Sequence, residues 1–274
     1  MALKENSTCG CSATPVVWVG YYPPRIGWGP RVVRIVGAAA AGFIAAASIV
    51  GRVDGAFAQS EASGEHIDHS LYFGGVDLWR NGSFLHGGML WSPDGLGREG
   101  FTLKVLLAGG SYNYLSGTTE ITGTQLLTNV MPGWRFKGDH YEAMIFGGVE
   151  LQSNNFAPDD PGNRLRGITG ALRVGGDIWY QPNDWMMATA AVSASTAAAS
   201  FWSRAALGWR LLDWAWVGPE ASALGDHDYQ QLRLGVHVTA FKTGRFEWSA
   251  GFGEVWDTDH RAGVYGRIGL LTRR

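Results

Sequence analysis

The sequence of 274 residues has little lysine, only two cysteines and, beyond its N-terminal region, no long hydrophobic run. Cys9 and Cys11 lack a preceding apolar run, so they are poor candidates for a lipid anchor or a metal site. The 216 residues from Gln59 onward carry 17 basic and 22 acidic side chains, a formal net charge of −5. This charge gives no electrostatic basis for binding nucleic acid, so we expect no nucleic-acid partner.

The N-terminal region contains the pattern of an export signal. Arginines precede an apolar run over residues 35–50, and Ala56-Phe57-Ala58 has the small-x-small form of a signal peptidase site. The run is rich in Ala and Gly and is shorter than the ~20 apolar residues of a membrane-spanning helix. We therefore expect residues 1–58 to be an N-terminal extension and cleaved signal peptide, and residues 59–69 to be a short periplasmic tail.

What recurs after Gln59 is alternation with a period of two, whereas no stripe with the 3.6-residue period of a helix appears. In the segment 201–211, one side carries Trp202, Arg204, Ala206, Gly208 and Arg210, and the other carries Phe201, Ala205, Leu207, Trp209 and Leu211. The same separation of polar from apolar rows occurs in segments 140–151, 166–180, 246–252 and 261–270. This pattern predicts β-strands with one apolar face and one polar face.

Turn signals such as Asn81-Gly82 divide the chain into about twelve strands. These are predicted near residues 70–80, 82–92, 100–112, 120–136, 139–152, 165–181, 184–196, 199–211, 214–224, 228–241, 245–256 and 260–271. An even number of long antiparallel strands favours a closed barrel, which has no free edges. Longer connections at 113–119 and 153–164 alternate with short ones, as outer loops alternate with periplasmic turns. The long connection at 93–99 departs from this rule.

The two rows of side chains need different surroundings. In a membrane barrel the apolar row faces lipid and the polar row faces the lumen, whereas a soluble up-and-down barrel reverses the two faces. The signal segment favours lipid, and so do aromatic residues near strand ends: Tyr180, Trp209, Trp214, Trp248 and Trp256. We expect an all-β fold, a closed antiparallel transmembrane β-barrel over residues 70–274 in the cell outer membrane, with membrane lipid as its partner.

Several motifs carry a resemblance to a known family. They comprise Pro158, Asp160, Pro161, Asn163, Gly167 and Gly170, the stretches WSRAALGWR (202–210) and VGPEASALG (217–225), and Tyr229, Arg233 and Gly235. In these motifs the chain resembles the alphaproteobacterial cellulose biosynthesis protein BcsS family, from about residue 70 onward. The resemblance implies an outer-membrane setting and a link to bacterial cellulose production. It supplies no catalytic residues.

Charged residues on the inward rows form one candidate site. Arg204, Glu220 and Arg233 fall at similar heights on neighbouring strands, so we expect an Arg–Glu–Arg cluster there. The full set of expected lumen charges is Arg173, Asp177, Arg204, Arg210, Glu220, Arg233, Glu247 and Arg267. Paired charges would brace or plug the lumen, and open ones would line a substrate pathway.

The outer loops form a second candidate site, facing glycan. Its expected members are Phe156, Pro158, Asp160, Asn163, Tyr229 and Trp256. Aromatic faces suit the faces of sugar rings, and amide and carboxylate groups suit their hydroxyls. Cellulose, or other components of cellulose synthesis, are the partners that the resemblance implies.

The motifs point to a non-enzymatic role. No Gly-x-Ser-x-Gly elbow occurs, and we expect no catalytic site, metal site or cofactor. The expected function is to assist export, anchoring or organisation of the glucan at the cell surface. The alternatives are a porin-like diffusion channel for small solutes and, less favoured, a lipid hydrolase built into the barrel around His237 and Ser249 or around His260 and nearby loop residues. The oligomeric state stays open.

Overall fold

The computed structural model describes residues 67–212 and 214–274, so the expected signal segment lies outside the described residues. The described residues form twelve strands and one short 3-10 helix: β1 (Ser70–Trp79), β2 (Gly82–Trp91), β3 (Gly100–Ser116), β4 (Thr119–Lys137), β5 (Tyr141–Ala157), β6 (Gly167–Asn183), β7 (Met186–Ser195), η1 (Ala197–Ala199), β8 (Phe201–Leu211), β9 (Ala215–Gly225), β10 (Gln230–Thr243), β11 (Phe246–Asp257) and β12 (Ala262–Arg273). None of the helices in this part of the chain is long and apolar enough to cross a membrane.

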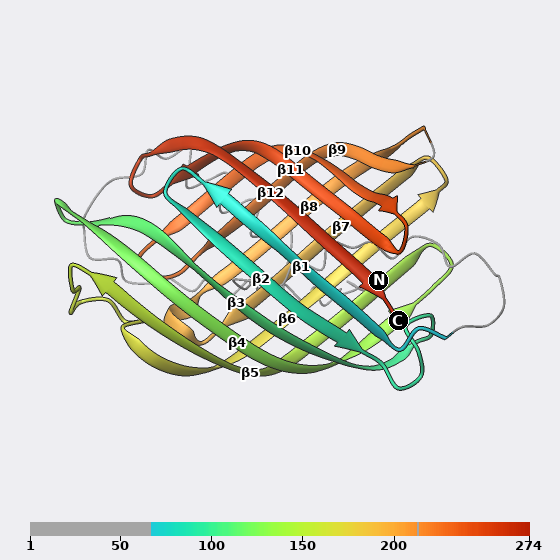
Figure 1. The fold of residues 1–274 in the computed structure, drawn as a ribbon, viewed down its shortest axis with the longest axis horizontal. Coiled ribbons are helices and arrows are strands. Elements are labelled where there is room, and N and C mark those ends of the chain that lie inside the picture. Colours follow the sequence, from blue (N-terminus) through green and yellow to red (C-terminus); the bar gives the residue numbers. More distant parts are fainter. Residues whose placement is uncertain (1–66, 213) are drawn as a thin grey trace, which may run out of the picture. The chain divides into compact units, whose positions relative to one another are not determined.

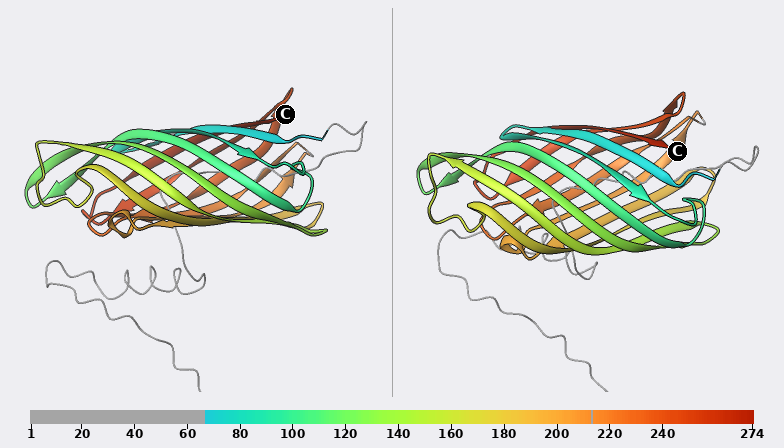
Figure 2. Two further views of the ribbon diagram at one scale, coloured as in Figure 1. Left: turned by 90° about the horizontal axis from the view of Figure 1, so that it is seen from below. Right: turned by 60° about the horizontal axis from the view of Figure 1, so that its bottom comes forward.

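The strands form one closed antiparallel barrel. Each strand pairs with its neighbours in sequence, and β1 pairs with β12 from Leu71 opposite Arg273 to Trp79 opposite Tyr265. Figure 1 shows β1 beside β12 at this seam. Figure 2 shows the strands running obliquely around the barrel. Closure pairs the backbone of every strand and leaves no free edge, which confirms the predicted twelve-stranded barrel.

The outward row is apolar around the barrel. On β8, Trp202 and Arg204 are buried in the interior, while Leu207 and Trp209 point outward and are exposed. The other strands contribute further large exposed side chains: Leu85, Leu107, Leu126, Ile145, Val149, Ile168, Leu172, Val236, Phe252, Val264 and Ile268. An apolar surface of this extent is matched by lipid rather than water. The protein is therefore an outer-membrane β-barrel, as the alternation predicts.

Aromatic side chains gather outside the barrel near the end that carries the C-terminus. They are Tyr72, Trp91, Phe101, Trp134, Phe136, Tyr141, Tyr180, Trp185, Trp209 and Trp214, all exposed. Amphipathic rings of this kind form a girdle at the boundary between lipid and water. The girdle marks this end of the barrel as one membrane interface.

The connections give the barrel its direction. At the end with the C-terminus, β4–β5, β6–β7 and β10–β11 are joined by short turns at 138–140, 184–185 and 244–245. The longest connection at the opposite end is 158–166, and Figure 1 shows the two ends at right and left respectively. Short turns are typical of the periplasmic side and longer loops of the outer side. We call these ends the periplasmic end and the outer end.

Strands β3, β4 and β5 are longer than the sequence pattern predicts, whereas β6 has the predicted length, shifted by two residues. All four contain 17 to 19 residues, whereas about 9–11 are enough to cross a bilayer. Strand β3 continues to Ser116 and β4 begins at Thr119, so the loop expected at 113–119 is a tight hairpin instead. Beyond the lipid the outward row carries polar residues such as Thr122 and Asn155, and the alternation that reveals strands is therefore lost.

Candidate functional site

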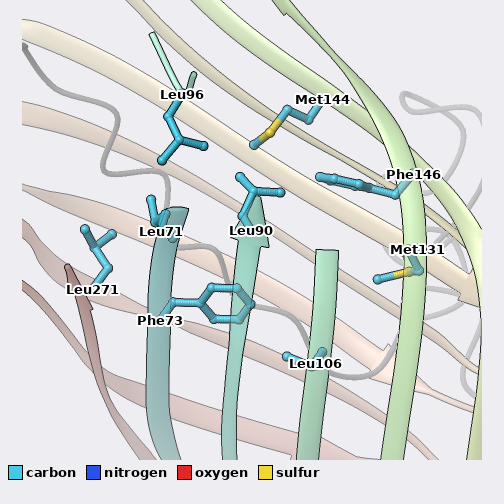
Figure 3. Close-up of a cluster of buried hydrophobic side chains, with 9 residues drawn as sticks. All are labelled: Leu71, Phe73, Leu90, Leu96, Leu106, Met131, Met144, Phe146 and Leu271. Atoms are coloured by element: carbon cyan, nitrogen blue, oxygen red, sulfur yellow. The ribbon is translucent and has the colours of Figure 1, made fainter. Parts of the chain in front are cut away.

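The periplasmic end of the lumen is filled by apolar side chains. The cluster consists of Leu71, Phe73, Leu90, Leu96, Leu106, Met131, Met144, Phe146 and Leu271. Figure 3 shows these side chains converging inside the wall of the barrel. A second buried cluster, on other strands at the same end, contains Trp179, Met187, Trp216 and Ala240. The lumen is therefore not polar throughout, in contrast to the expectation from the sequence.

The long periplasmic loop 92–99 supplies part of this apolar filling. Leu96 is buried in the cluster, and its backbone N–H donates to the carbonyl of Asp68 at 2.7 Å. Its carbonyl accepts a hydrogen bond from the guanidinium of Arg135, and Lys137 Nζ donates to the carbonyl of Gly97 at 2.8 Å. The loop is thus fastened across the mouth of the barrel. This explains why the first long connection lies on the periplasmic side.

The middle of the lumen holds a buried ion cluster centred on Glu220. Its Oε2 atom lies 2.8 Å from Arg204 Nη2 and 2.5 Å from Arg267 Nη2, and Tyr265 donates its hydroxyl to Oε1 at 2.7 Å. Glu220, Arg204 and Arg267 are all buried. A carboxylate shared by two guanidinium groups and a phenol is fully satisfied in a dry environment.

Two glycines allow Arg267 and Tyr265 to reach Glu220. Strand β12 is separated from β9 by two strands, β10 and β11. A Cβ atom on Gly251 of β11 would overlap the Glu220 carboxylate and lie 2.7 Å from Arg267 Nε. A Cβ atom on Gly235 of β10 would lie 2.6 Å from the Tyr265 hydroxyl. Because glycine has no side chain, these two positions leave room for Tyr265 and Arg267 to contact Glu220.

The ion cluster differs from the expected Arg204–Glu220–Arg233 arrangement. Arg204 and Arg233 both stand opposite Ser222, but Arg233 Nη1 lies 3.3 Å from Asp77 Oδ1 on β1. Its Nη2 donates to Gln231 Oε1 at 3.0 Å, toward the outer end. Arg267 takes the second position beside Glu220. The register alone therefore does not decide which arginine approaches the carboxylate.

Other predicted charges also face the interior. Lys104 Nζ lies 3.2 Å from Asp177 Oδ2 and 4.7 Å from the centre of the Phe146 ring. Arg173 pairs with Glu150, whose other oxygen accepts from Ser195 at 2.8 Å. The remaining two lie toward the periplasmic end: Arg210 is 5.2 Å from the Trp216 ring, and Glu247 is buried.

The most deeply placed arginines of these ion pairs are shielded from solvent. Only 1% of Arg173 and 2% of Arg267 are exposed. Arginines that lined an open aqueous pore would be accessible to solvent over a much larger fraction. The lumen charges therefore brace the barrel from inside.

The outer end of the lumen contains a cavity of about 90 Å³, which we call the outer pocket. Its aromatic lining consists of Trp79, Phe84, Tyr112, Trp202 and Tyr229. Its polar lining consists of Asp77, His86, Gln125, Asp226, Gln231 and Arg233, and Leu165, Leu224 and Gly225 complete the wall. The volume exceeds what one water molecule needs, and the mixture of rings and hydrogen-bonding groups is typical of a small-molecule site.

Hydrogen bonds fix the polar wall of the outer pocket. The Tyr229 hydroxyl accepts from Gln231 Nε2 at 2.6 Å and donates to Asp257 Oδ2 at 3.2 Å. The Arg233 guanidinium lies 4.9 Å from the Trp79 ring and 5.5 Å from the Tyr265 ring. These side chains are held in place before any ligand arrives, which reduces the entropy lost on binding.

The loop 158–166 covers one side of the outer pocket through a local hydrogen-bond network. Tyr114 donates its hydroxyl to Asp160 Oδ2 at 2.7 Å and accepts from Asn163 Nδ2 at 3.0 Å. Asn163 Oδ1 accepts from the backbone N–H of Leu165 at 2.9 Å. Asp160 and Asn163 thus hold the loop in position and bring Leu165 to the pocket wall.

The six residues expected to face glycan are therefore separated. Tyr229 lines the outer pocket, and Phe156 on β5 packs edge-on against Tyr114 with ring centres 6.0 Å apart. Pro158 is exposed in the loop, and Trp256 lies on the outward face of β11, where 37% of it is exposed. Trp202 lies on a predicted inward row, but neither it nor Trp79, Phe84 or Tyr112 is among the residues expected to face glycan. These residues occupy inward-facing positions of the two-residue alternation near the outer ends of their strands, and this placement could have identified them from the sequence.

Arg261 ties two connections together at the outer rim. It lies in the β11–β12 connection, and its Nη2 donates to the carbonyl of Asn113 at 2.9 Å and to Asp259 Oδ2 at 2.8 Å. Asp259 in turn accepts from the backbone N–H of Leu115 at 3.0 Å. The long β3–β4 hairpin is thereby joined to the β11–β12 connection, past the short β1–β2 hairpin.

The loop between β9 and β10 contains a partly buried acid beside the outer pocket. Asp226 Oδ1 accepts from the backbone N–H groups of Asp228 at 2.8 Å and Tyr229 at 3.0 Å. Burial raises the pKa of Asp226, and these two hydrogen bonds oppose the rise. In residues 67–212 and 214–274, no three side chains of His, Cys, Asp or Glu gather in a way that could hold a metal ion.

Comparison with known proteins identifies the family. Solved barrels with similar folds include the KdgM porin (11% identity, covering 74% of this chain and 98% of that chain, TM-score 0.45) and LpxR from Salmonella typhimurium (10%, 74% and 99%, TM-score 0.45). The translocator domain of the autotransporter NalP from Neisseria meningitidis is a third (13%, 81% and 91%, TM-score 0.45). Comparison with curated proteins finds no matching sequence. The family model described as cellulose biosynthesis protein BcsS matches residues 71–274, and the chain therefore belongs to this family.

Proposed function

We propose that this protein is a non-enzymatic component of cellulose biosynthesis that retains or organises the glucan at the outer surface and does not conduct it through the barrel. Membership of the BcsS family supports the link to cellulose. The position of the outer pocket, at the end of the barrel facing the cell exterior, supports a role at the surface.

The observation that carries this proposal is the filled lumen. A glucan chain crossing the barrel would have to displace the apolar cluster that contains Leu96 and then the ion cluster around Glu220. Breaking a buried ion pair costs several kcal/mol, about 3–5 when one partner is removed. The same two layers argue against the alternative of a diffusion channel, because that alternative needs an open aqueous path.

The arrangement of His237 supports a structural role rather than a catalytic one. Its Nε2 atom donates to the carbonyl of Leu207 at 2.9 Å, and its Nδ1 atom lies 2.9 Å from Thr239 Oγ1. A neutral imidazole that donates from Nε2 accepts at Nδ1, so both ring nitrogens are engaged. A general base needs a free nitrogen directed at the nucleophile. The contacts of His237 therefore argue against a hydrolase site inside the barrel.

The test combines a deletion strain with electrical recording. Deleting the gene should reduce the cellulose retained at the cell surface, measured by dye binding and by hydrolysis to glucose, and the wild-type gene should restore it. The purified barrel in planar bilayers should show no stable conductance. Normal surface cellulose in the deletion strain, together with robust conductance of the purified barrel, would reject the proposal and favour the channel.

A further inference from the structure

The outer pocket has the composition of a sugar site. Trp202 is 6% exposed at the start of β8, and Tyr112, Tyr229 and Trp79 bring further rings from other strands and from the β9–β10 loop. Rings from separate strands provide flat apolar surfaces on different sides of one cavity. Such surfaces suit a ligand that has flat apolar faces and polar edges.

The charge of the outer pocket favours an uncharged ligand. Arg233 is paired with Asp77 at 3.3 Å, so the most deeply placed cation of the wall is already neutralised. The amides of Gln125 and Gln231 offer both donors and acceptors, as hydroxyl groups require. An acidic oligosaccharide would need an excess of cationic side chains, which this wall does not provide.

One polar group on the wall also lacks a partner. The indole Nε1 of Trp79 is buried and makes no hydrogen bond to the described residues. A buried donor without an acceptor costs about 1–3 kcal/mol. The N–H is covered in this arrangement, so a ligand oxygen would reach it only after the Trp79 side chain turned toward the pocket, and as it stands Trp79 offers a ligand its ring.

We propose that the outer pocket binds a glucopyranose unit of a β-1,4-linked glucan that enters from the cell exterior; the choice of this glucan rests on the proposed function. A β-linked glucopyranose carries its ring substituents equatorially, so both of its faces are apolar and its hydroxyls lie around the edge. On the periplasmic side of the pocket, the ion cluster around Glu220 closes the lumen. The pocket therefore accepts the end of a chain and does not thread it.

The test is a titration of the purified full-length mature barrel with cellohexaose, followed by tryptophan fluorescence and calorimetry. The detergent should have no sugar head group, so that it does not compete for the pocket. Wild-type protein should bind cellohexaose and should bind the α-1,4-linked maltohexaose at least about ten-fold more weakly, because its axial linkages break the flat faces. Trp202→Ala should raise the Kd for cellohexaose about ten-fold or more, since it removes a buried aromatic contact.

Two further variants separate binding from folding. Leu224→Trp should abolish binding by filling the outer pocket without removing any of its rings. Trp256→Ala is the matched control, because Trp256 lies at the same end of the barrel on the outward face. Each variant is compared only after it shows the heat-dependent gel mobility of a folded barrel.

Three outcomes would overturn the inference: no binding by folded wild-type protein, equal loss in Trp256→Ala, or equal affinity for the two hexaoses. None of them contradicts the proposed function, which is measured separately as surface cellulose in the deletion strain. Conversely, cellohexaose binding with the expected pattern of variants would stand even if the deletion strain retained normal cellulose.

Discussion

The two ends of the barrel interior are built from different chemistry on the same scaffold. The periplasmic end is closed by apolar side chains around Leu96, whereas the outer end keeps a cavity lined by rings and hydrogen-bonding groups. Lipid constrains only the outward row of each strand, so the inward row is free to change along the barrel. The alternation of outward apolar side chains therefore specifies the barrel, while the identity of the inward side chains determines which end has a cavity for a ligand.

The largest expected effect comes from the layer that separates the two ends. Glu220→Ala would leave the buried guanidinium groups of Arg204 and Arg267 facing each other without their shared carboxylate. We expect a loss of about 3–5 kcal/mol of stability. The measurement is the unfolding transition in detergent, with Glu99→Ala in the exposed periplasmic loop as the control. An unchanged transition would mean that water reaches the layer and that the two ends are not separated.

The next effect tests the periplasmic end alone. Leu96→Ala removes a buried side chain from the apolar cluster and should cost about 2–4 kcal/mol through lost burial and the cavity that remains. Leu212→Ala is the control, since Leu212 is 83% exposed. Cellohexaose affinity should stay unchanged in Leu96→Ala at temperatures where it is folded. A change in affinity would show that the two ends are coupled.

A smaller effect tests how the middle layer is assembled. Gly251→Ala would force the Glu220 carboxylate and Arg267 to move, and overpacking of this kind costs about 1–3 kcal/mol. Gly266→Ala on β12 is the matched control, because a Cβ atom there meets nothing within 4 Å. The measurement is the unfolding transition of each variant in detergent, which should be lowered in Gly251→Ala and not in Gly266→Ala. Equal transitions would argue against the close approach described at Gly251.

The smallest effect lies at the outer end and has the opposite sign. Asp226→Asn keeps an oxygen to accept from Asp228 and Tyr229 but removes a charge that burial disfavours. Because the folded-state pKa of Asp226 is raised, ionising it costs stability once the pH exceeds the ordinary Asp pKa of about 3.9. The variant should therefore unfold at a slightly higher temperature than wild type at pH 7. The difference should disappear below about pH 4, and a difference that persists there would contradict this explanation.

The sequence predicts the barrel well because lipid forces outward positions within the bilayer to be apolar. Leu207 and Trp209 face outward and Trp202 and Arg204 inward, as the two-residue pattern requires. The pattern fails at Phe156, where β5 has left the bilayer and its outward row is polar. The sequence pattern therefore predicts loops where the strands extend beyond the membrane.

The interior was predictable only in part. The two-residue alternation identifies which charged residues face inward. It does not show that Arg267 and not Arg233 lies beside Glu220, because that contact depends on the space left by Gly235 and Gly251 on the two intervening strands. The burial of Leu96 depends on where a loop folds back, and no local period encodes that. The outer pocket likewise joins positions from Trp79 to Arg233 that lie far apart in sequence.

The contacts of Arg261 at the outer rim have a mechanical consequence. A fibre held at the cell surface would pull on the parts of the barrel that project furthest, and β3–β4 is a long hairpin beside the short β1–β2 hairpin. Through Asn113 and Asp259, Arg261 connects this hairpin to the β11–β12 connection. Tension applied to the hairpin would be shared with strands on the other side of the barrel seam, so that several ladders of backbone hydrogen bonds carry the load in shear together.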